Sequence, residues 1–458
     1  MRDRISCYSD RANLIEEERL PDAHCGLQGS SSLPGASAAP TKVCMVVKNQ
    51  LWNDARVKKE ALSLTKAGYG VTIVAKPEEN RPVEENWEGV RILRPPKDSA
   101  TRQALRQKIV SAHPPSSTAL RSRLVRVIRR NRLRRAFTDL KRDLPWEYRL
   151  YRAICSTKAD IVHAHDLDTL LVGAAAAVKL GAQLVYDSHE LWLHSARYLR
   201  ETGPLNRLRY RLTERILIRR ADAVIAVTPS RGRAMESMYP ELTGRLTIVE
   251  NSTEPLDPLP ESNVLKNRLN LPDNLPVVLY QGILCPERGL EELLYSARLL
   301  PEGSAAIVLV GHDAWAGRLQ RLHAKLGLED RVHILPPVPS EKLPEVTVSA
   351  DAGLILFQNT CLNHTYSLPN KLYEYMMAGL PILASDLPEI RRVLEDSECG
   401  LLLENPSPEV IARDILRLTT SREAMKKMGA RGRKTALERY CWPVQAERLL
   451  AMYRELDK

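Results

Sequence analysis

The sequence predicts an α/β protein with two doubly wound parallel sheets. Its 458 residues exceed one ordinary domain, and a 44% apolar content provides for two large cores. Short apolar runs alternate with helical segments in both halves, which is typical of parallel sheets covered by helices. A proline-spaced connector, residues 251–262, separates the halves as a hinge would.

The amino-terminal half is predicted to begin after a tail without structure. Residues 1–40 lack sustained periodicity and end in a run rich in Gly, Ser, Ala and Pro, so we expect them to be disordered. The first domain then covers residues 41–254. Its expected strands cover residues 42–47, 69–76, 159–166, 182–190 and 221–230, and its expected helices include residues 54–68 and 168–181.

The carboxyl-terminal half repeats the pattern over residues 255–435. Its expected strands cover residues 276–282, 305–313, 331–338, 352–358 and 380–386, and its expected helices include residues 289–300 and 371–379. Two such domains joined by a hinge imply a cleft, with ligands bound where loops leave the carboxyl ends of the strands.

Most of the positive charge lies in one segment. The formal net charge is +11, and residues 101–142 hold thirteen Lys or Arg residues against one acid, Asp139. Apolar residues recur there at helical spacing, so an insertion at residues 101–144 is predicted to form a basic amphipathic helix. Such a helix can bind an anionic membrane surface; the alternative is a solvated insertion. Nucleic acid is not expected as a partner, because only Phe137 interleaves the arginines.

Cysteine usage and hydropathy favour the cytoplasm. None of the eight cysteines forms a Cys-x-x-Cys pair, and residues 1–22 are charged rather than signal-like. The longest apolar run, residues 170–178, is far shorter than the roughly 18 residues that a spanning helix needs. We expect a cytoplasmic protein that can lie peripherally at the inner face of the membrane.

The stretch SLPNKLYEYMMAGLPILASD, residues 367–386, contains the strongest candidate site. Pro369 suits a first helical turn, Ser367 is the expected N-cap, and Gly379 is placed to end the helix in a left-handed conformation. This punctuation alone also fits any helix that leads into a strand.

The start of that helix has the chemistry of an anion site. Free N–H groups at Asn370, Lys371 and Leu372, together with the lysine ammonium, suit a diphosphate. Glu374 lies five residues beyond Pro369, roughly 7.5 Å along the helix, which matches the reach from a diphosphate to its ribose. Its carboxylate is therefore expected to accept hydrogen bonds from the ribose hydroxyls.

A second loop of the same domain adds phosphate-binding groups. The stretch GILCPERGLEEL places Gly282 at a strand end and Arg288 just before a helix. Glycine lets the backbone approach a phosphate closely, and arginine can bind phosphate oxygens with two hydrogen bonds.

Several motifs in this order resemble the family 4 glycosyltransferases, also called group 1. They include NDARVKKEALSLTKAGYGVTIVAK, DIVHAHDLD, VYDSHELW, RADAVIAVTPS, YQGILCPERGLEEL, LVGHDAWAGRL and SLPNKLYEYMMAGLPILASD. The resemblance covers roughly residues 42–456 and implies the GT-B fold, a retaining reaction and a nucleotide-sugar donor without a bound metal. RYCWPVQAERLLAMYREL resembles the family's terminal helix, so residues 436–458 are expected to pack back on the amino-terminal domain.

The resemblance also implies roles for single residues. Glu374 matches the second glutamate of the family's Glu-x7-Glu motif, which holds the donor ribose. Arg288 matches its phosphate-binding basic residue, Gly282 its loop glycine, and Gly311 lies in a further matching motif beside the donor. His189 matches a histidine near the donor sugar and acceptor.

The chain departs from the family at two positions. Tyr366 stands where the first glutamate would fall, and Ile283 replaces an arginine that often follows the loop glycine. These changes affect the usual contacts to the sugar and one phosphate contact, and Lys371 can supply the missing charge.

We therefore expect sugar transfer from a nucleotide-sugar to a membrane-presented or lipid-linked glycan. Arg288 and Lys371 would stabilise the departing diphosphate, and His189 would orient or polarise the acceptor. The alternatives are a nucleotide-sugar epimerase of the same fold and a catalytically degenerate scaffold that binds membrane or partners.

The stretch HAHDLD holds residue types that bind transition metals, namely His163, His165, Asp166 and Asp168. Alternating strand geometry puts the two histidines on one side, where they can equally pack or hydrogen-bond in the cleft. No metal and no other cofactor is expected.

Overall fold

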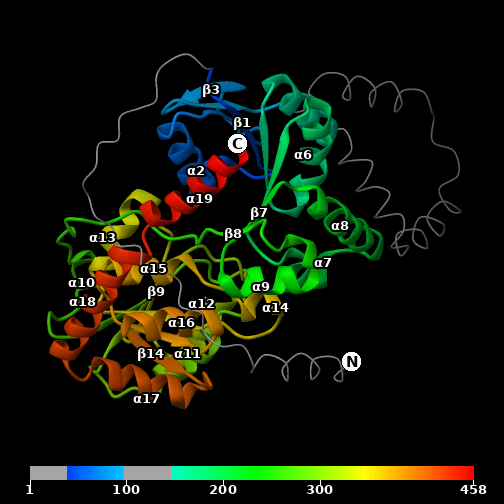
Figure 1. The fold of residues 1–458 in the computed structure, drawn as a ribbon. Helices are drawn as coiled ribbons and strands as arrows, with labels where there is room; N and C mark the ends of the chain where they lie inside the picture. Colours follow the sequence, from blue (N-terminus) through cyan, green and yellow to red (C-terminus); the bar gives the residue numbers. More distant parts are fainter. Residues whose placement is uncertain (1–38, 97–145) are drawn as a thin grey trace, which may run out of the picture. The chain divides into compact units, whose positions relative to one another are not determined.

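The computed structural model describes residues 39–96 and 146–458 as two parallel sheets with helices on both faces (Figure 1). This arrangement confirms the predicted α/β class with two doubly wound sheets. The predicted basic helix at residues 101–144 and nearly all of the predicted tail at residues 1–40 lie outside the described residues. Within the described part, no helix is long and apolar enough to cross a bilayer.

The amino-terminal sheet has the strand order β3-β4-β2-β1-β5-β6-β7-β8 among the described residues. Every neighbouring pair is parallel except β3 and β4 at one edge. These two strands and β8 at the other edge are additional to the predicted strands. The strands are β1 (Lys42–Val46), β2 (Gly70–Val74), β3 (Glu84–Trp87), β4 (Val90–Leu93), β5 (Ile161–His165), β6 (Gln183–Ser188), β7 (Ala223–Ala226) and β8 (Leu246–Ile248). The helices are η1 (Leu51–Asn53), α2 (Ala55–Lys66), a helix at residues 146–157, α6 (Leu167–Leu180), η2 (Trp192–His194), α7 (Ala196–Glu201), α8 (Pro204–Leu217), η3 (Ile218–Arg220), α9 (Pro229–Met238) and η4 (Pro240–Leu242).

Alternating side chains of this sheet feed two separate cores. On β1, Val43 and Met45 pack with α2 and the terminal helix, whereas Cys44 and Val46 pack with α6. Because both faces are covered, the strands carry almost continuous apolar runs.

The carboxyl-terminal sheet has the order β11-β10-β9-β12-β13-β14, and all its pairs are parallel. The strands are β9 (Val277–Gln281), β10 (Ala306–Val310), β11 (Val332–Leu335), β12 (Ala352–Ile355), β13 (Ile382–Ser385) and β14 (Gly400–Leu403). The helices are α10 (Val264–Leu269), α11 (Leu290–Ala297), α12 (Arg318–Leu326), η5 (Ser340–Lys342), α13 (Leu343–Val348), α14 (Leu362–Thr365), α15 (Asn370–Met377), α16 (Pro388–Ser397), α17 (Pro408–Thr419), α18 (Arg422–Arg439) and α19 (Trp442–Leu456).

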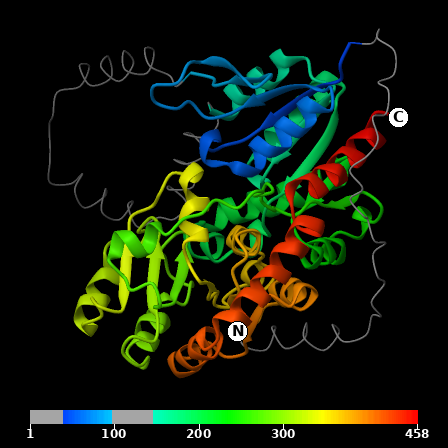
Figure 2. The same cartoon turned by 90° about the vertical axis from the view of Figure 1, so that its left-hand side faces the viewer.

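The end of the chain returns to the amino-terminal sheet (Figure 2). Helix α18 continues past the expected boundary at residue 435, and α19 begins at Trp442. The indole of Trp442 donates to Ser63 Oγ of α2 at 3.0 Å, and Tyr453 Oη lies 2.9 Å from His163 Nδ1. The second domain is thereby tied to the first by a helix as well as by the connector.

Candidate functional site

Two cations lie together at the carboxyl ends of the strands of the second sheet. Arg288, which precedes α11, has its guanidinium 4.0 Å from the ring centre of Phe357, and one of its terminal nitrogens is buried without a hydrogen-bond partner among the described residues. Lys371 Nζ lies 3.5 Å from the ring centre of Tyr280. Burial and the nearby Arg288 lower the pKa of Lys371 to about 7. Two cations placed close together, without a carboxylate ion pair to either among the described residues, form a site that favours an anion.

Two glycines allow the backbone to come close to this anion site. Gly282 has φ +127°, and a Cβ there would lie 3.4 Å from Lys371 Nζ. Gly311 packs directly against the Gly282 backbone, since a Cβ at Gly311 would lie 1.7 Å from the Gly282 carbonyl oxygen. Gly282 therefore opens the site to a ligand, whereas the role of Gly311 is to let two strand ends pack against each other.

The amino-terminal end of α15 corrects two sequence predictions. Pro369, not Ser367, is the N-cap, because the helix begins at Asn370; the Ser367 hydroxyl accepts from no N–H of this helix among the described residues and donates to Asn363 O at 2.8 Å. The Leu372 N–H is not free for a ligand, since it donates to Pro369 O at 2.9 Å, and the Leu372 side chain is buried in the core. Gly379 ends the helix with φ +73°, as predicted.

The remaining amides of that first turn point to a smaller anion site than predicted. Among the described residues, no acceptor is recorded for the backbone N–H of Asn370 or Lys371. The Asn370 side chain accepts a hydrogen bond of 2.8 Å from Asn251, which lies in the connector between the domains. The helix start therefore offers two amides next to the Lys371 ammonium.

Glu374 lies on the same helix, one turn further on. Its carboxylate accepts a hydrogen bond from the Gln281 side chain, and Thr347 in turn donates to Gln281 Oε1 at 2.9 Å. Burial raises the pKa of Glu374, and the hydrogen bond from Gln281 offsets part of that rise. The carboxylate is thus held in one orientation.

The two departures from the family pattern lie in different surroundings. Ile283 is 56% exposed beside Gly282, so the position of the missing arginine is open to solvent. Tyr366 packs against the core of the amino-terminal domain, and its carbonyl accepts from Thr228 Oγ1 at 3.4 Å. The residue at 366 therefore contributes to contact between the domains.

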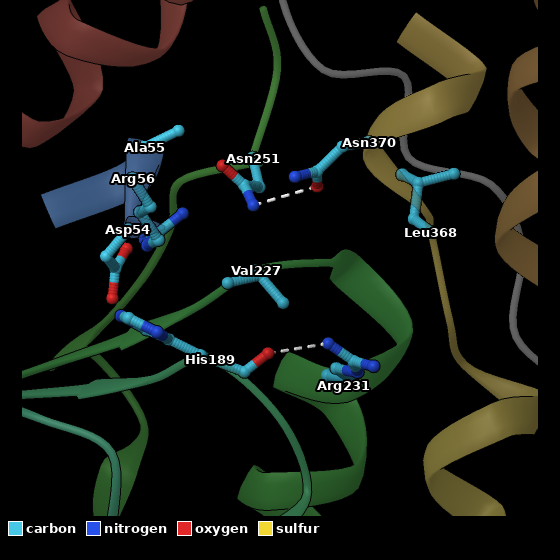
Figure 3. A pocket seen from close by; sticks show the side chains of 9 residues that line it. All are labelled: Asp54, Ala55, Arg56, His189, Val227, Arg231, Asn251, Leu368 and Asn370. Carbon is cyan, nitrogen blue, oxygen red and sulfur yellow. Dashed lines mark hydrogen bonds between the residues drawn. The ribbon is translucent and has the colours of Figure 1, made fainter. Parts of the chain in front are cut away.

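A cavity of about 240 Å³ lies beside His189, between the first sheet and the start of α15 (Figure 3). It is lined by Asp54, Ala55, Arg56, His189, Val227, Arg231, Asn251, Leu368 and Asn370. Gly282, Arg288, Lys371 and Glu374 are not in its wall, so the cavity and the anion site are neighbouring spaces that share the start of α15.

His189 is held between acidic groups. Its Nε2 lies 3.2 Å from Asp187 Oδ2, and its Nδ1 lies 3.5 Å from Asp166 Oδ2. Burial opposes the charged imidazolium, but the two carboxylates outweigh burial and raise the pKa of His189 to about 10. His189 is therefore a cation and hydrogen-bond donor at neutral pH, which does not suit the role of a general base.

Two arginines of the site were not predicted. Arg56 Nε donates to Asp187 Oδ2 at 2.9 Å, which fixes the carboxylate that holds His189. Arg231 donates to His189 O at 2.8 Å and reaches Asn363 O at 3.3 Å, so it joins the two domains beside the cavity. Both pairings bring together residues far apart in sequence. The only local signal was for Arg56, a charged residue at the start of a predicted helix; Arg231 lies just after a predicted strand, where no helix was predicted.

The structure gives the two histidines of HAHDLD different acidic neighbours from those in the metal hypothesis. His163 and His165 do share a side, with ring centres 4.2 Å apart, but their acidic neighbours are Glu60 and Asp187 rather than Asp166 and Asp168. The potential ligand atoms lie within 4.8 Å of one another. Arg56 Nε lies 2.9 Å from a carboxylate oxygen of both Glu60 and Asp187, and this fixed cation disfavours a divalent ion.

Two family profiles match the chain. The profile for glycosyltransferase family 4 covers residues 56–255, and that for glycosyl transferases group 1 covers residues 261–435. The chain belongs to the group 1 glycosyltransferases. It is an enzyme of the transferase class, which disfavours the epimerase and the non-catalytic scaffold.

Curated relatives of this glycosyltransferase include two enzymes with named activities. A D-inositol 3-phosphate glycosyltransferase from Streptosporangium roseum is 26% identical over 306 residues, which cover 64% of this chain and 69% of that protein. An MMP alpha-(1->4)-mannosyltransferase from Mycolicibacterium hassiacum is 26% identical over 320 residues, 67% of this chain and 74% of that protein.

Solved structures confirm the GT-B fold of the glycosyltransferase. Sucrose-phosphate synthase from Thermosynechococcus elongatus matches with a TM-score of 0.69 at 18% identity, covering 91% of this chain and 99% of that one. HepE of Anabaena, solved with UDP and glucose, matches with a TM-score of 0.63 at 16% identity, covering 91% and 100%.

Proposed function

We propose that this glycosyltransferase moves a sugar, with retention of configuration, from a nucleotide-sugar to a membrane-presented or lipid-linked glycan. The observation that carries the donor assignment is the pair of cations at Arg288 and Lys371. One guanidinium nitrogen is buried without a partner in the described part of the chain, and the ammonium has a lowered pKa because of burial and its cationic neighbour. A diphosphate would satisfy the nitrogen and neutralise both charges. HepE, which has the same fold, binds UDP and UDP-glucose, and this supports the proposal.

In this proposal the diphosphate lies against Gly282, Arg288, Lys371 and the start of α15, and Glu374 accepts from the ribose hydroxyls. Departure of the nucleoside diphosphate builds negative charge, and prearranged cations and amides stabilise that charge most. No resident metal is needed for this, because the protein's own cations occupy the site. Stoichiometric metal after gentle purification, or loss of activity with a chelator, would contradict that part of the proposal.

The acceptor is proposed to bind in the cavity beside His189. His189 carries a proton at neutral pH. Its Nδ1 lies 3.5 Å from Asp166 Oδ2 and makes no hydrogen bond to a described residue, so this N–H would donate to an acceptor or sugar oxygen and orient it. The cavity lies in part on the amino-terminal domain, whose sequence also contains the basic insertion at residues 101–144. An anionic leaflet on the cytoplasmic side would attract that charge and present a lipid-linked acceptor.

A thermal-shift screen against UDP, GDP, ADP, TDP and their sugar conjugates tests the donor proposal. A ligand at 100 times its dissociation constant adds about 2.7 kcal/mol of stability. One nucleotide series should stabilise the protein, and Glu374→Ala should lose that response. Glu395→Ala is the matched control, because Glu395 is exposed on α16 and pairs only with Arg391 among the described residues. A folded protein that responds to no nucleotide would contradict the proposal.

The anomeric outcome and the acceptor need a separate experiment. Membrane lipid extract and the labelled donor found in the screen should yield a labelled, lipid-soluble product whose new linkage keeps the donor's anomeric configuration by NMR. An inverted linkage would contradict retention, and a purely water-soluble product would contradict the lipid-linked acceptor.

A further inference from the structure

Helix α8 exposes an apolar stripe. Leu205, Leu208, Leu212 and Ile216 are 37%, 54%, 48% and 55% exposed, and they recur at i, i+3, i+7 and i+11. This spacing places all four on one side of the helix, along roughly 16 Å of its length. A surface helix normally turns such a stripe into the core, so its exposure indicates a surface that binds something.

The stripe is bordered by cations. Arg209 lies beside one edge of it by helical position, Arg211 and Arg215 lie towards the other, and Arg219 and Arg220 follow in η3. Arg209 is paired with Glu147 and Arg219 with Glu241, so, within the described ranges, the unpaired charge that α8 places beside the stripe lies at Arg211 and Arg215. No ion pair joins Arg211 or Arg215 to another described residue. The only acid of the helix, Glu214, is buried and accepts from Tyr239 Oη at 2.8 Å, so it does not offset the charge at the surface.

Neighbouring helices expose further apolar side chains. Leu199 of α7 is 45% exposed, and α6, which packs against α8, exposes Leu171 at 42% and Val178 at 72%. In Figure 1, α6, α7 and α8 lie on the same flank of the amino-terminal domain. The helices of this flank therefore expose further apolar side chains besides the stripe.

We propose that α8 docks this glycosyltransferase on an anionic lipid surface, with its four apolar side chains at the acyl boundary and its arginines among the headgroups. Apolar residues on one face with arginines at its borders are the composition of helices that lie in a membrane interface. Two other possible occupants, a second copy of the chain and the insertion at residues 101–144, are disfavoured by their positive charge. A second copy would bring the same cationic face, and the chain's own insertion at residues 101–144 is itself strongly basic.

This inference rests on the proposed function, because docking on a membrane would serve the enzyme only if its acceptor is presented there. Its test is independent, since lipid binding is measured without donor or acceptor. Failure of the lipid experiment would leave nucleotide binding untouched, and failure of nucleotide binding would leave lipid binding untouched.

The test is vesicle co-sedimentation of the full chain with neutral phosphatidylcholine and with vesicles that contain phosphatidylglycerol. The wild type should bind the anionic vesicles more tightly, and added salt should weaken that binding. Leu208→Glu with Leu212→Glu should reduce affinity at least tenfold, because both side chains would have to leave the acyl boundary. Arg211→Gln with Arg215→Gln should reduce it roughly fivefold for each arginine.

Leu299→Glu is the matched control, because Leu299 is 52% exposed but lies in the other domain, just after α11. It should bind vesicles as the wild type does, and circular dichroism should show all variants folded. Wild-type affinity in the Leu208/Leu212 variant would overturn the proposal. The proposal would also be overturned if light scattering showed a wild-type dimer and a monomeric Leu208/Leu212 variant. It would likewise be overturned if the wild type bound no lipid and the variant had a lower melting temperature.

Discussion

Replacing Lys371 by Met is expected to stabilise the ligand-free protein and to weaken nucleotide binding at the same time. Lys371 is only 9% exposed, and its ammonium faces Arg288 and the ring of Tyr280, with no carboxylate ion pair to any residue in the described ranges. A buried cation in such a place costs stability until an anion binds. Methionine has a similar length and removes the charge without leaving a large cavity.

The size of the stability gain follows from the pKa of Lys371. Its fall from 10.5 to about 7 sets a ceiling of about 5 kcal/mol at about 1.4 kcal/mol per unit. Water entering the site reduces this, so we expect a gain of about 1–4 kcal/mol, as when other poorly compensated buried charges are replaced by apolar groups. The destabilisation by Lys371 is complete below pH 7, where this lysine is protonated in both the folded and the unfolded protein. It fades as the pH rises towards 10.5, above which the lysine is neutral in both.

Denaturant unfolding at pH 6.5 and pH 9.5 measures that gain, and calorimetric titration with the nucleotide found in the screen measures binding. Affinity should fall about tenfold or more, since a hydrogen bond to a charged group contributes about 1.5–3 kcal/mol. Lys266→Met is the control: Lys266 is 8% exposed but lies 3.3 Å from Asp351, so its loss should destabilise. Lower stability of Lys371→Met at pH 6.5, or unchanged nucleotide affinity, would refute the reasoning.

Three further predictions concern the neighbouring residues. The nucleotide affinity of the wild type should fall as the pH rises from about 7 to 9, by up to about tenfold per pH unit, because Lys371 loses its proton. Calorimetric titration of Lys371→Met should show a weaker dependence of affinity on pH, and equal slopes for the two proteins would contradict this. His189→Gln should lower kcat at least tenfold in a transfer assay and change the dissociation constant of the nucleotide less than twofold, whereas equal losses in both would indicate a structural role. Gly311→Ala should cost about 1–3 kcal/mol in thermal unfolding and weaken nucleotide binding through Gly282; Gly70→Ala, whose Cβ would meet nothing nearer than 3.8 Å, should cost less than half as much.

Local pattern predicted the sheets and the helix of the donor site because both depend on residues close in sequence. Apolar runs and glycine stops specify strands and helix ends, and Gly379 ends α15 with positive φ as its position predicted. Strands β3, β4, β8 and β14, at or next to the sheet edges, were not predicted, since strands of three or four residues carry little periodic signal.

The site's electrostatics depend on pairs distant in sequence, and pattern does not reveal these. Arg56 and Asp187 are separated by 131 residues, and Arg231 reaches a carbonyl 42 residues away. The Ser367 hydroxyl was predicted to cap α15, but that helix begins at Asn370, and Ser367 instead donates to Asn363 O in α14, a short helix that the sequence did not reveal. Likewise, the histidine pair was assigned acidic neighbours from its own motif, whereas the fold supplies Glu60 and Asp187 from elsewhere.

The measurement that tests the donor site most directly is calorimetric titration of wild type, Arg288→Gln and Arg298→Gln with a nucleoside diphosphate and with its nucleoside. Arg298 is exposed just after α11 and serves as the matched control. If Arg288 binds the diphosphate, the wild type and Arg298→Gln should prefer the diphosphate to the nucleoside by at least tenfold, and Arg288→Gln should lose most of that preference. An equal preference in all three proteins would contradict a diphosphate site at Arg288.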